Sequence, residues 1–70
     1  MQAKAVKKTM AERLALARIA AGYTQYEVGL HLGVRAHTVS RWERGETSPT
    51  IDLLRRLAEL YGVSVGRLVE

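Results

Sequence analysis

The sequence predicts an all-α protein, a compact bundle of five short helices. Residues 9–12 and 24–27 both run from a threonine to a glutamate at the spacing of a capping box, which marks the first turn of a helix. Apolar residues recur every three or four positions after these starts, and glycines follow where a helix would end. The sequence has neither the alternation with a period of two nor the Asn-Gly turns that indicate strands.

The first helix is expected over residues 10–21 and the second over residues 25–32, each followed by a glycine that can take a left-handed conformation. A third helix is expected over residues 36–44. After a capping threonine, a fourth is expected over residues 51–61, and a short fifth over residues 64–69. The residues expected to pack inside share a helical spacing and are Met10, Leu14, Ala17, Ala21, Val39, Trp42, Ile51, Leu54, Leu57, Ala58 and Tyr61.

The domain organisation is expected to be simple. Residues 9–70 should form a single domain, and residues 1–8 a basic N-terminal arm. The chain of 70 residues has room for one small core, and 47% of its residues are apolar, which is enough to fill it. We find no internal repeat, low-complexity segment or second domain in the sequence.

Composition and charge exclude several classes of function. Cysteine is absent, and His31 and His37 alone are too few ligands for zinc, so neither a metal nor another cofactor is expected. There is no pattern of nucleophile, base and orienting group and no glycine-rich phosphate loop, which argues against an enzyme. No apolar run approaches the ~20 residues that span a bilayer, so a cytoplasmic protein without a membrane partner is expected. The net charge of +4 favours a polyanionic partner.

The most informative pattern lies in residues 25–45. Two short helices are joined here by only three residues, 33–35, which forces them to cross at a steep angle. Gly33 supplies the backbone freedom that this tight connection needs. Gly29 is expected to face the other helix at a point where a larger side chain would hold the two apart. The pattern therefore predicts a helix-turn-helix whose second helix projects from the body.

The projecting helix is expected to turn a polar face outward, while Val39 and Trp42 point into the core. A helix of this diameter fits the major groove of DNA, where arginine pairs with guanine and threonine or histidine offers smaller polar contacts. The start of the preceding helix, at Thr24 and Gln25, presents free N–H groups to a phosphate. The outward-facing residues are Arg35, His37, Thr38, Arg41 and Arg44.

Residues 38–45 read Thr-Val-Ser-Arg-Trp-Glu-Arg-Gly, which is a specific block when it stands between the flanking matches. With these residues the sequence resembles the Cro/repressor-type helix-turn-helix family of phage and bacterial regulators. The resemblance extends from about residue 10 to residue 69. The other matching positions are Leu14, Arg18, residues 22–25, residues 32–34, Pro49, Ile51, Leu54, residues 57–58 and residues 62–64.

The resemblance implies a lambda-repressor-like fold and a sequence-specific regulator that binds double-stranded DNA. In this family the third helix reads the bases, and its reading positions correspond here to Ala36, His37, Thr38 and Arg41. The loop after that helix follows the DNA backbone. Together with the start of the second helix and the basic arm, the residues expected to contact the backbone are Thr24, Gln25, Arg35, Arg44, Thr47, Ser48, Lys7 and Lys8.

The resemblance also implies a structural contact and shows some departures. Arg18 and Glu43 match a family pair that bridges the first and third helices. Arg35 stands where a serine or threonine usually caps the third helix, Gly29 replaces a common alanine, and Ala17 replaces a common leucine. These differences bear on the target sequence more than on DNA binding itself.

A homodimer on a pseudo-palindromic operator is expected, since related regulators bind such sites as dimers, and a repressor or autoregulator is the expected role. The expected interface is Val65, Leu68 and Val69, because the four preceding helices account for the core and the fifth is too short to stand alone.

Two other interpretations remain. The same fold serves as an interaction module, such as an antitoxin with a protein partner, and Leu16 with Ile19 lies off the core stripe where such a partner could bind. An isolated DNA-targeting domain of a larger enzyme is disfavoured, because Met1 and Glu70 are expected to bound a complete unit.

Overall fold

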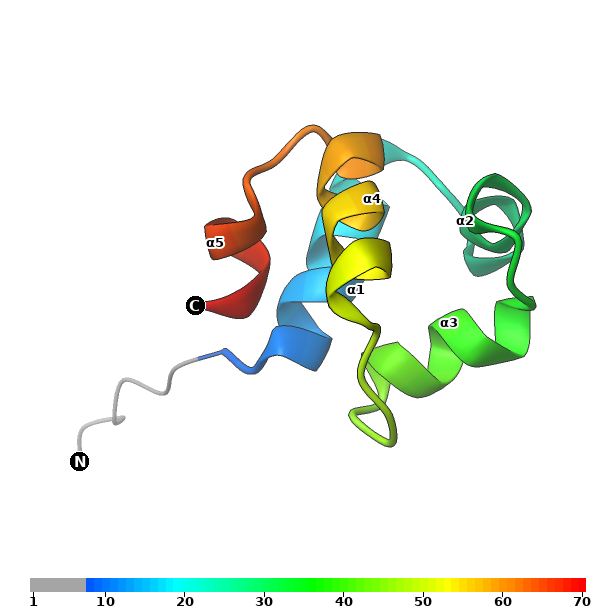
Figure 1. Ribbon diagram of the computed structural model, residues 1–70, viewed down its shortest axis with the longest axis horizontal. Helices are drawn as coiled ribbons and strands as arrows, with labels where there is room; N and C mark the ends of the chain where they lie inside the picture. The colour runs from blue at the N-terminus through cyan, green and yellow to red at the C-terminus, as the bar shows by residue number, and fades with distance from the viewer. Residues whose placement is uncertain (1–7) are drawn as a thin grey trace, which may run out of the picture.

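The computed structural model describes residues 8–70, and within them the chain forms five α-helices and no strand (Figure 1). The helical bounds differ from the sequence prediction only at the end of the third helix and the start of the fifth, by one residue each. The predicted all-α class is therefore confirmed. The helices are α1 (Met10–Ala21), α2 (Gln25–Leu32), α3 (Ala36–Glu43), α4 (Ile51–Tyr61) and α5 (Val65–Val69).

The helix starts are as the sequence predicts. The Thr9 side chain accepts a hydrogen bond from the Glu12 N–H at 3.1 Å, and the Glu12 carboxylate accepts one from the Thr9 N–H at 2.8 Å. Thr24 and Glu27 form the same reciprocal pair. Two orphan N–H groups are satisfied at each of these ends, which makes the start of each helix well defined. α3 lacks such a contact, because Arg35 at its cap position makes no side-chain hydrogen bond to the helix.

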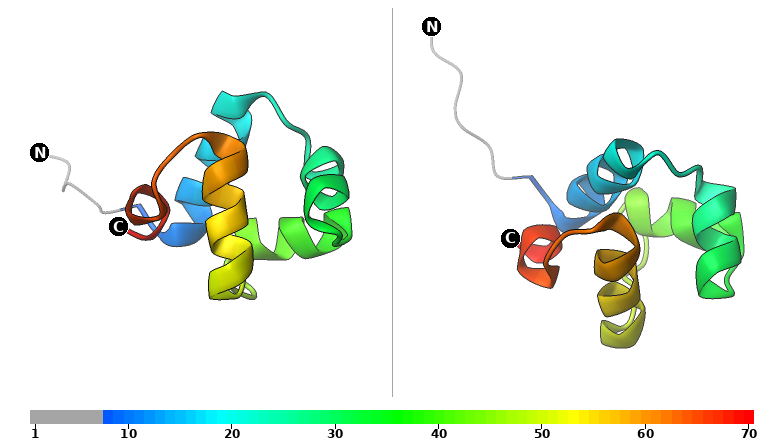
Figure 2. Two further views of the ribbon diagram at one scale, coloured as in Figure 1. Left: turned by 45° about the horizontal axis from the view of Figure 1, so that its top comes forward. Right: turned by 90° about the horizontal axis from the view of Figure 1, so that it is seen from above.

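α1 and α4 lie side by side at the centre of the molecule (Figures 1 and 2). α2 and α3 pack against each other on one side of this pair, and α3 also contacts α1. α5 lies on the other side, against α1 and α4. The helix-turn-helix thus projects from one end of the molecule, and the short last helix covers the other.

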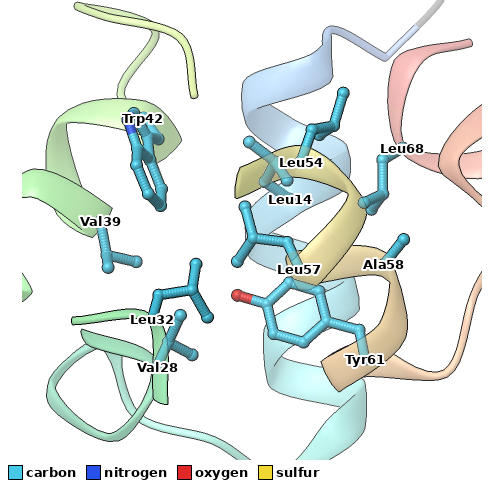
Figure 3. Close-up of a cluster of buried hydrophobic side chains, with 10 residues drawn as sticks. All are labelled: Leu14, Val28, Leu32, Val39, Trp42, Leu54, Leu57, Ala58, Tyr61 and Leu68. Carbon is cyan, nitrogen blue, oxygen red and sulfur yellow. The ribbon is translucent and has the colours of Figure 1, made fainter. Parts of the chain in front are cut away.

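The core fills the space between α1, α4 and the helix-turn-helix (Figure 3). Val39 and Trp42 of α3 point into it, as predicted. Two residues of the predicted set lie outside it, since Ile51 is 57% exposed and Ala21 is also exposed. Each is a terminal residue of its helix, so neighbouring elements cover it from fewer sides. The buried apolar residues are Leu14, Val28, Leu32, Val39, Trp42, Leu54, Leu57, Ala58, Tyr61 and Leu68.

Leu68 corrects one sequence-based expectation. Its side chain is fully buried in the monomer, where α5 closes the core over α1 and α4. The prediction that Leu68 lies in a dimer interface is therefore wrong. Val65, one turn earlier, is half-buried and packs against the same core, whereas Val69 is 43% exposed. A helix of five residues has one buried face, and α5 turns that face inward.

The connection between α2 and α3 depends on two glycines. Gly33 ends α2 with φ +75°, in the left-handed region that glycine enters without strain. Gly29 lies directly against the connection, because a Cβ built on it would approach the Val34 carbonyl oxygen to 2.5 Å. The prediction that Gly29 allows a close approach is thus confirmed. The close approach sets the position of α3 relative to α2.

Replacing Gly33 with alanine should lower the free energy of unfolding by about 1–2 kcal/mol. The cause is backbone strain alone, since a Cβ at this position has no neighbour within 4 Å. Gly66→Ala is the matched control, because Gly66 lies inside α5 at negative φ and alanine is the better helix former. Urea unfolding followed by circular dichroism measures both variants. Equal midpoints for Gly33→Ala and the parent would contradict the left-handed conformation assigned to this turn.

Candidate nucleic-acid interface

The outer face of α3 carries a row of exposed polar side chains. Arg35 lies at its cap, His37 and Arg41 lie one turn apart along it, and Arg44 follows its last residue, and all four are exposed. Ala36 and Thr38 are half-buried beside them. The structure therefore brings the residues predicted to read bases onto one helix, with His37 and Arg41 as its most accessible members.

The first turn of α2 lies beside α3 and presents backbone N–H groups at its positive end. The Thr24 hydroxyl is committed to capping that turn. The Gln25 side chain donates a hydrogen bond from Nε2 to Glu43 Oε1 at 3.0 Å, which joins the first residue of α2 to the last residue of α3. Any anion at this turn would meet the backbone of α2, while the glutamine keeps the two helices in register.

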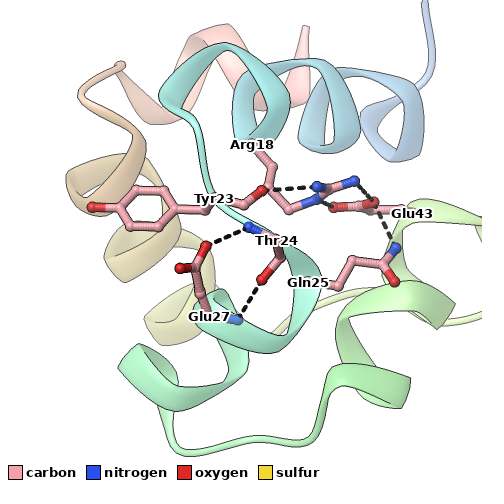
Figure 4. A network of polar contacts seen from close by, with 6 residues as sticks. All are labelled: Arg18, Tyr23, Thr24, Gln25, Glu27 and Glu43. Atoms are coloured by element: carbon pink, nitrogen blue, oxygen red, sulfur yellow. Dashed lines mark hydrogen bonds and ion pairs between the residues drawn. The ribbon is translucent and has the colours of Figure 1, made fainter.

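A network centred on Glu43 holds this arrangement together (Figure 4). Arg18 of α1 donates to both carboxylate oxygens of Glu43, from Nε at 2.7 Å and from Nη2 at 3.0 Å. The third guanidinium nitrogen, Nη1, donates to the Tyr23 carbonyl at 2.9 Å. Both side chains are largely buried, at 15% exposed for Arg18 and 7% for Glu43. The predicted bridge between the first and third helices is thus confirmed, and it also includes Gln25.

Electrostatics in this network follow from its burial. The hydrogen bonds to Glu43 raise the pKa of the Arg18 guanidinium above its ordinary value, and they outweigh burial, which acts in the opposite direction. Burial also raises the pKa of the neighbouring Tyr61 hydroxyl well above its ordinary range, with the Glu43 carboxylate adding to the effect. Arg18 is therefore a charged structural residue, and Tyr61 a neutral one.

The loop between α3 and α4 contains a residue that the sequence interpretation missed. Glu46 lies with its Oε2 3.0 Å from Arg44 Nε and its Oε1 3.5 Å from Arg41 Nε. All three side chains are about half exposed. Gly45, at φ +74°, turns the chain back over the end of α3 and brings Glu46 there. The signal in the sequence was a glutamate directly after a helix-ending glycine.

The other residues predicted to contact the DNA backbone do not lie on α3. Thr47 and Ser48 are exposed in the loop after α3, next to Arg44 in sequence. Lys8 is exposed and lines the same pocket as Arg67 and Leu68 of α5. Since α5 lies at the end of the molecule away from α2 and α3 (Figure 1), the structure does not bring Lys8 together with the α3 residues. Lys7 lies outside the described residues.

Other kinds of site find little support in the part of the chain that the structure describes. Among residues 8–70, no three histidine, cysteine, aspartate or glutamate side chains are grouped so that they could hold a metal ion. Within the same residues, no helix combines the length and the apolar character needed to cross a membrane.

The fold and this surface define a class of protein. Two helices crossing at a tight turn, the second projecting with a polar, cationic outer face, form a helix-turn-helix unit. A sequence model of the helix-turn-helix family matches residues 14–68. The chain belongs to this family, and the resemblance to its Cro/repressor-type members is confirmed.

Two curated relatives are transcriptional regulators. The HTH-type transcriptional regulator ImmR of Bacillus subtilis (strain 168) is 38% identical over 61 residues, which are 87% of this chain and 48% of ImmR. The cryptic phage CTXphi transcriptional repressor RstR of Vibrio cholerae is 35% identical over 52 residues, 74% of this chain and 47% of RstR. The chain thus spans about half the length of the curated relatives it matches.

Solved structures share the fold. The P22 c2 repressor, solved in complex with the synthetic operator 9T, is similar with a TM-score of 0.84 and 30% identity, over 91% of this chain and 97% of that chain. Hydroxypropylphosphonic acid epoxidase from S. wedmorenis has a TM-score of 0.80 and 32% identity, over 87% of this chain but 32% of the epoxidase. The similarity to the repressor therefore covers nearly all of both chains, whereas the similarity to the epoxidase covers about a third of the epoxidase chain.

Because of the Glu43 network, replacing Arg18 should lower the free energy of unfolding much more than replacing Arg44. Arg18→Met keeps the aliphatic stem but leaves the Glu43 carboxylate buried without its cation, and should lower the free energy of unfolding by roughly 3 kcal/mol. Arg44→Met, in an exposed ion pair, should change it by less than about 1 kcal/mol. Chemical denaturation followed by tryptophan fluorescence compares the two. A similar loss in both variants would show that the network does not support the fold.

Proposed function

We propose that this chain is a sequence-specific, double-stranded DNA-binding regulator of transcription, a repressor or autoregulator that acts in the cytoplasm as a homodimer on a pseudo-palindromic operator. The observation that carries the proposal is the exposed polar face of α3 with its flanking residues, which are Arg35, His37, Arg41 and Arg44. The ion pair between Glu43 and Arg18 holds α3 against α1. The likeness to a repressor solved with its operator supports it.

In this proposal α3 lies in the major groove and reads base edges. Arg41 has the reach and the two donors to pair with a guanine, and His37, one turn earlier, offers a smaller polar contact. Thr38 and Ala36 are half-buried, which suits short-range contacts such as packing on a thymine methyl. The residues proposed to read bases are Ala36, His37, Thr38 and Arg41.

Contacts to the DNA backbone would flank this helix on both sides. The first turn of α2, at Thr24 and Gln25, directs the positive end of its dipole toward a phosphate. Because the Thr24 N–H donates to Glu27, the Gln25 N–H is the backbone donor in this proposal. Arg35 at the start of α3 and Arg44 at its end add positive charge, which attracts DNA of any sequence. The residues proposed for the backbone are Thr24, Gln25, Arg35, Arg44, Thr47 and Ser48, with Lys7 and Lys8 as further sources of attraction.

A second candidate function is a protein-interaction module of the antitoxin type. The observation that favours it is the exposed apolar pair on α1, where Leu16 is 49% and Ile19 is 62% exposed. This surface belongs to α1 and not to α3, so it does not compete with the proposed DNA contacts. In vitro selection of bound DNA from a random pool separates the two candidates, because an interaction module alone would enrich no consensus.

The roles of Arg41 and Arg44 can be distinguished in the same selection. Arg41→Ala should weaken binding to the selected site by about 1–3 kcal/mol and relax the consensus at one position, because it removes a base contact. Arg44→Ala should weaken binding to all sequences about equally and reduce the salt slope by roughly one unit, because it removes a phosphate contact. An unchanged consensus with Arg41→Ala would rule out Arg41 as a base reader.

The dimer in this proposal is formed by the exposed side of α5. One half-site offers too few base contacts for useful selectivity against a genome of competing sites, and two α3 helices spaced by one turn of DNA provide the rest. Since Leu68 is buried in the core, the available apolar surface of α5 is Val69 with the exposed part of Val65. Both lie one turn apart on the same face of the helix.

Val69→Glu should therefore convert a dimeric parent to a monomer with much weakened operator binding, while circular dichroism shows an unchanged fold. Leu16→Glu, on α1, is the matched control and should remain dimeric. Light scattering and titration with operator DNA measure both properties. The reverse pattern would move the interface to α1, and tight operator binding by a monomeric parent would refute the dimer.

A further inference from the structure

A groove between α1 and α5 lies apart from the proposed base-reading helix, and Lys8 is the one proposed DNA contact among the residues that line it. It has a volume of about 350 Å³ and is lined by Leu16, three alanines of α1, and residues of the α4–α5 end of the chain. None of the α3 residues lines it. α5, which borders the groove, lies at the end of the molecule away from α2 and α3 (Figure 2), so an occupant would leave the α3 surface free. We name this feature the α1–α5 groove.

The rim of the α1–α5 groove is cationic. Lys8, Arg13 and Arg67 line it, and no acidic side chain does. Within residues 8–70, no carboxylate lies within ion-pair distance of these three side chains, whereas Arg18, Arg41 and Arg44 each have a glutamate partner. The rim therefore contains positive charge that the described protein does not neutralise.

Arg13 is held in place at this rim. Its Nη1 donates to the Arg67 carbonyl at 3.2 Å and its Nε to the Lys8 carbonyl at 3.3 Å, so it joins the start of α1 to α5. A guanidinium fixed by two backbone carbonyls loses little further freedom when it binds an anion, and it retains other N–H donors for that purpose. The rim thus presents a positioned anion-binding group next to an apolar floor.

The combination of floor and rim selects among occupants. A phosphate backbone would gain nothing from the apolar floor formed by Leu16, Ala17 and Ala20. A second copy of this chain would bring its own cationic rim toward this one across a two-fold axis, and like charges would repel. An apolar group flanked by carboxylates satisfies both parts of the groove. A groove of this size accepts one or two such side chains.

We propose that the α1–α5 groove is a docking site for a partner protein, which inserts apolar side chains from an acidic amphipathic helix and pairs its carboxylates with Lys8, Arg13 and Arg67. The exposed Ile19, one turn beyond Leu16, extends the apolar surface along α1 to match a helix longer than the groove. The inference does not depend on DNA binding, since it rests on a different face of the molecule.

The test is selection of a random-peptide library, displayed on phage, against the whole chain at about 0.15 M salt, where only close charge pairs contribute strongly. Enriched peptides should combine apolar residues at helical spacing with aspartate or glutamate. One selected peptide, synthesised with a fluorescent label, should bind the parent and weaken at least about tenfold with Leu16→Glu. Arg67→Gln should also weaken binding of this peptide, and higher salt should weaken its binding to the parent.

Leu30→Glu is the matched control, because Leu30 is an equally apolar residue of α2, 65% exposed, that does not line the groove. The selected peptide should bind this variant as it binds the parent. Circular dichroism of each variant separates loss of binding from loss of fold. A lack of acidic, apolar enrichment, or equal binding to Leu16→Glu and the parent, would overturn the proposal.

Two further outcomes would assign the groove to another occupant. A dimeric parent that becomes monomeric with Leu16→Glu would identify a second copy of the chain there. A loss of DNA affinity and salt slope with Arg67→Gln, without any peptide enrichment, would identify the rim as part of the DNA surface. Either result overturns the proposal, and neither would by itself overturn the reading of bases by α3.

Discussion

The buried ion pair between Arg18 and Glu43 is the contact on which the geometry of this molecule depends. It joins the last turn of α1 to the end of α3, and Gln25 adds the start of α2 to the same carboxylate. Separating the partners would leave charges buried without compensation, so the three helices have one favourable arrangement. The orientation of α3 toward any ligand is thus set from inside the protein, before that ligand arrives, and little entropy is lost on binding.

The fold was largely predictable because its signals are local. Capping threonines, left-handed glycines and apolar spacing depend on neighbours within a few residues, and the helices follow them closely. Leu68 and Ile51 were misplaced for the opposite reason. Both have apolar side chains at helical spacing, but Leu68 is buried because α5 packs across α1 and α4, whereas Ile51 is exposed because it is the first residue of α4. Periodicity indicates a face, and the tertiary arrangement determines whether another element covers it.

Some residues of the candidate site were likewise predictable from local sequence, and others depend on the tertiary structure. The α3 residues were predicted to share one face because their spacing along a helix follows from residue number alone, and the Arg18–Glu43 pair was expected from the resemblance to the family. Glu46 was missed because its approach to Arg41 and Arg44 depends on a turn at Gly45 that reverses the chain direction. Lys8 was grouped with the DNA contacts on charge alone, yet it lies beside α5. Charge in a sequence predicts attraction, and the fold decides at which surface that attraction acts.

The position of Glu46 has a consequence for how strongly a DNA-binding α3 would attract DNA. With the Glu46 carboxylate beside Arg41 and Arg44, engagement of DNA becomes an exchange of acceptors rather than the addition of new ones. A phosphate offers two acceptor oxygens and a guanine offers N7 and O6, so either could take the place of the carboxylate in the proposed complex. In the proposed complex the glutamate would therefore offset part of the attraction that Arg41 and Arg44 exert on DNA, by up to about 1 kcal/mol for each of these exposed pairs. Affinity for DNA of any sequence would then be lower than the positive charge around α3 alone suggests.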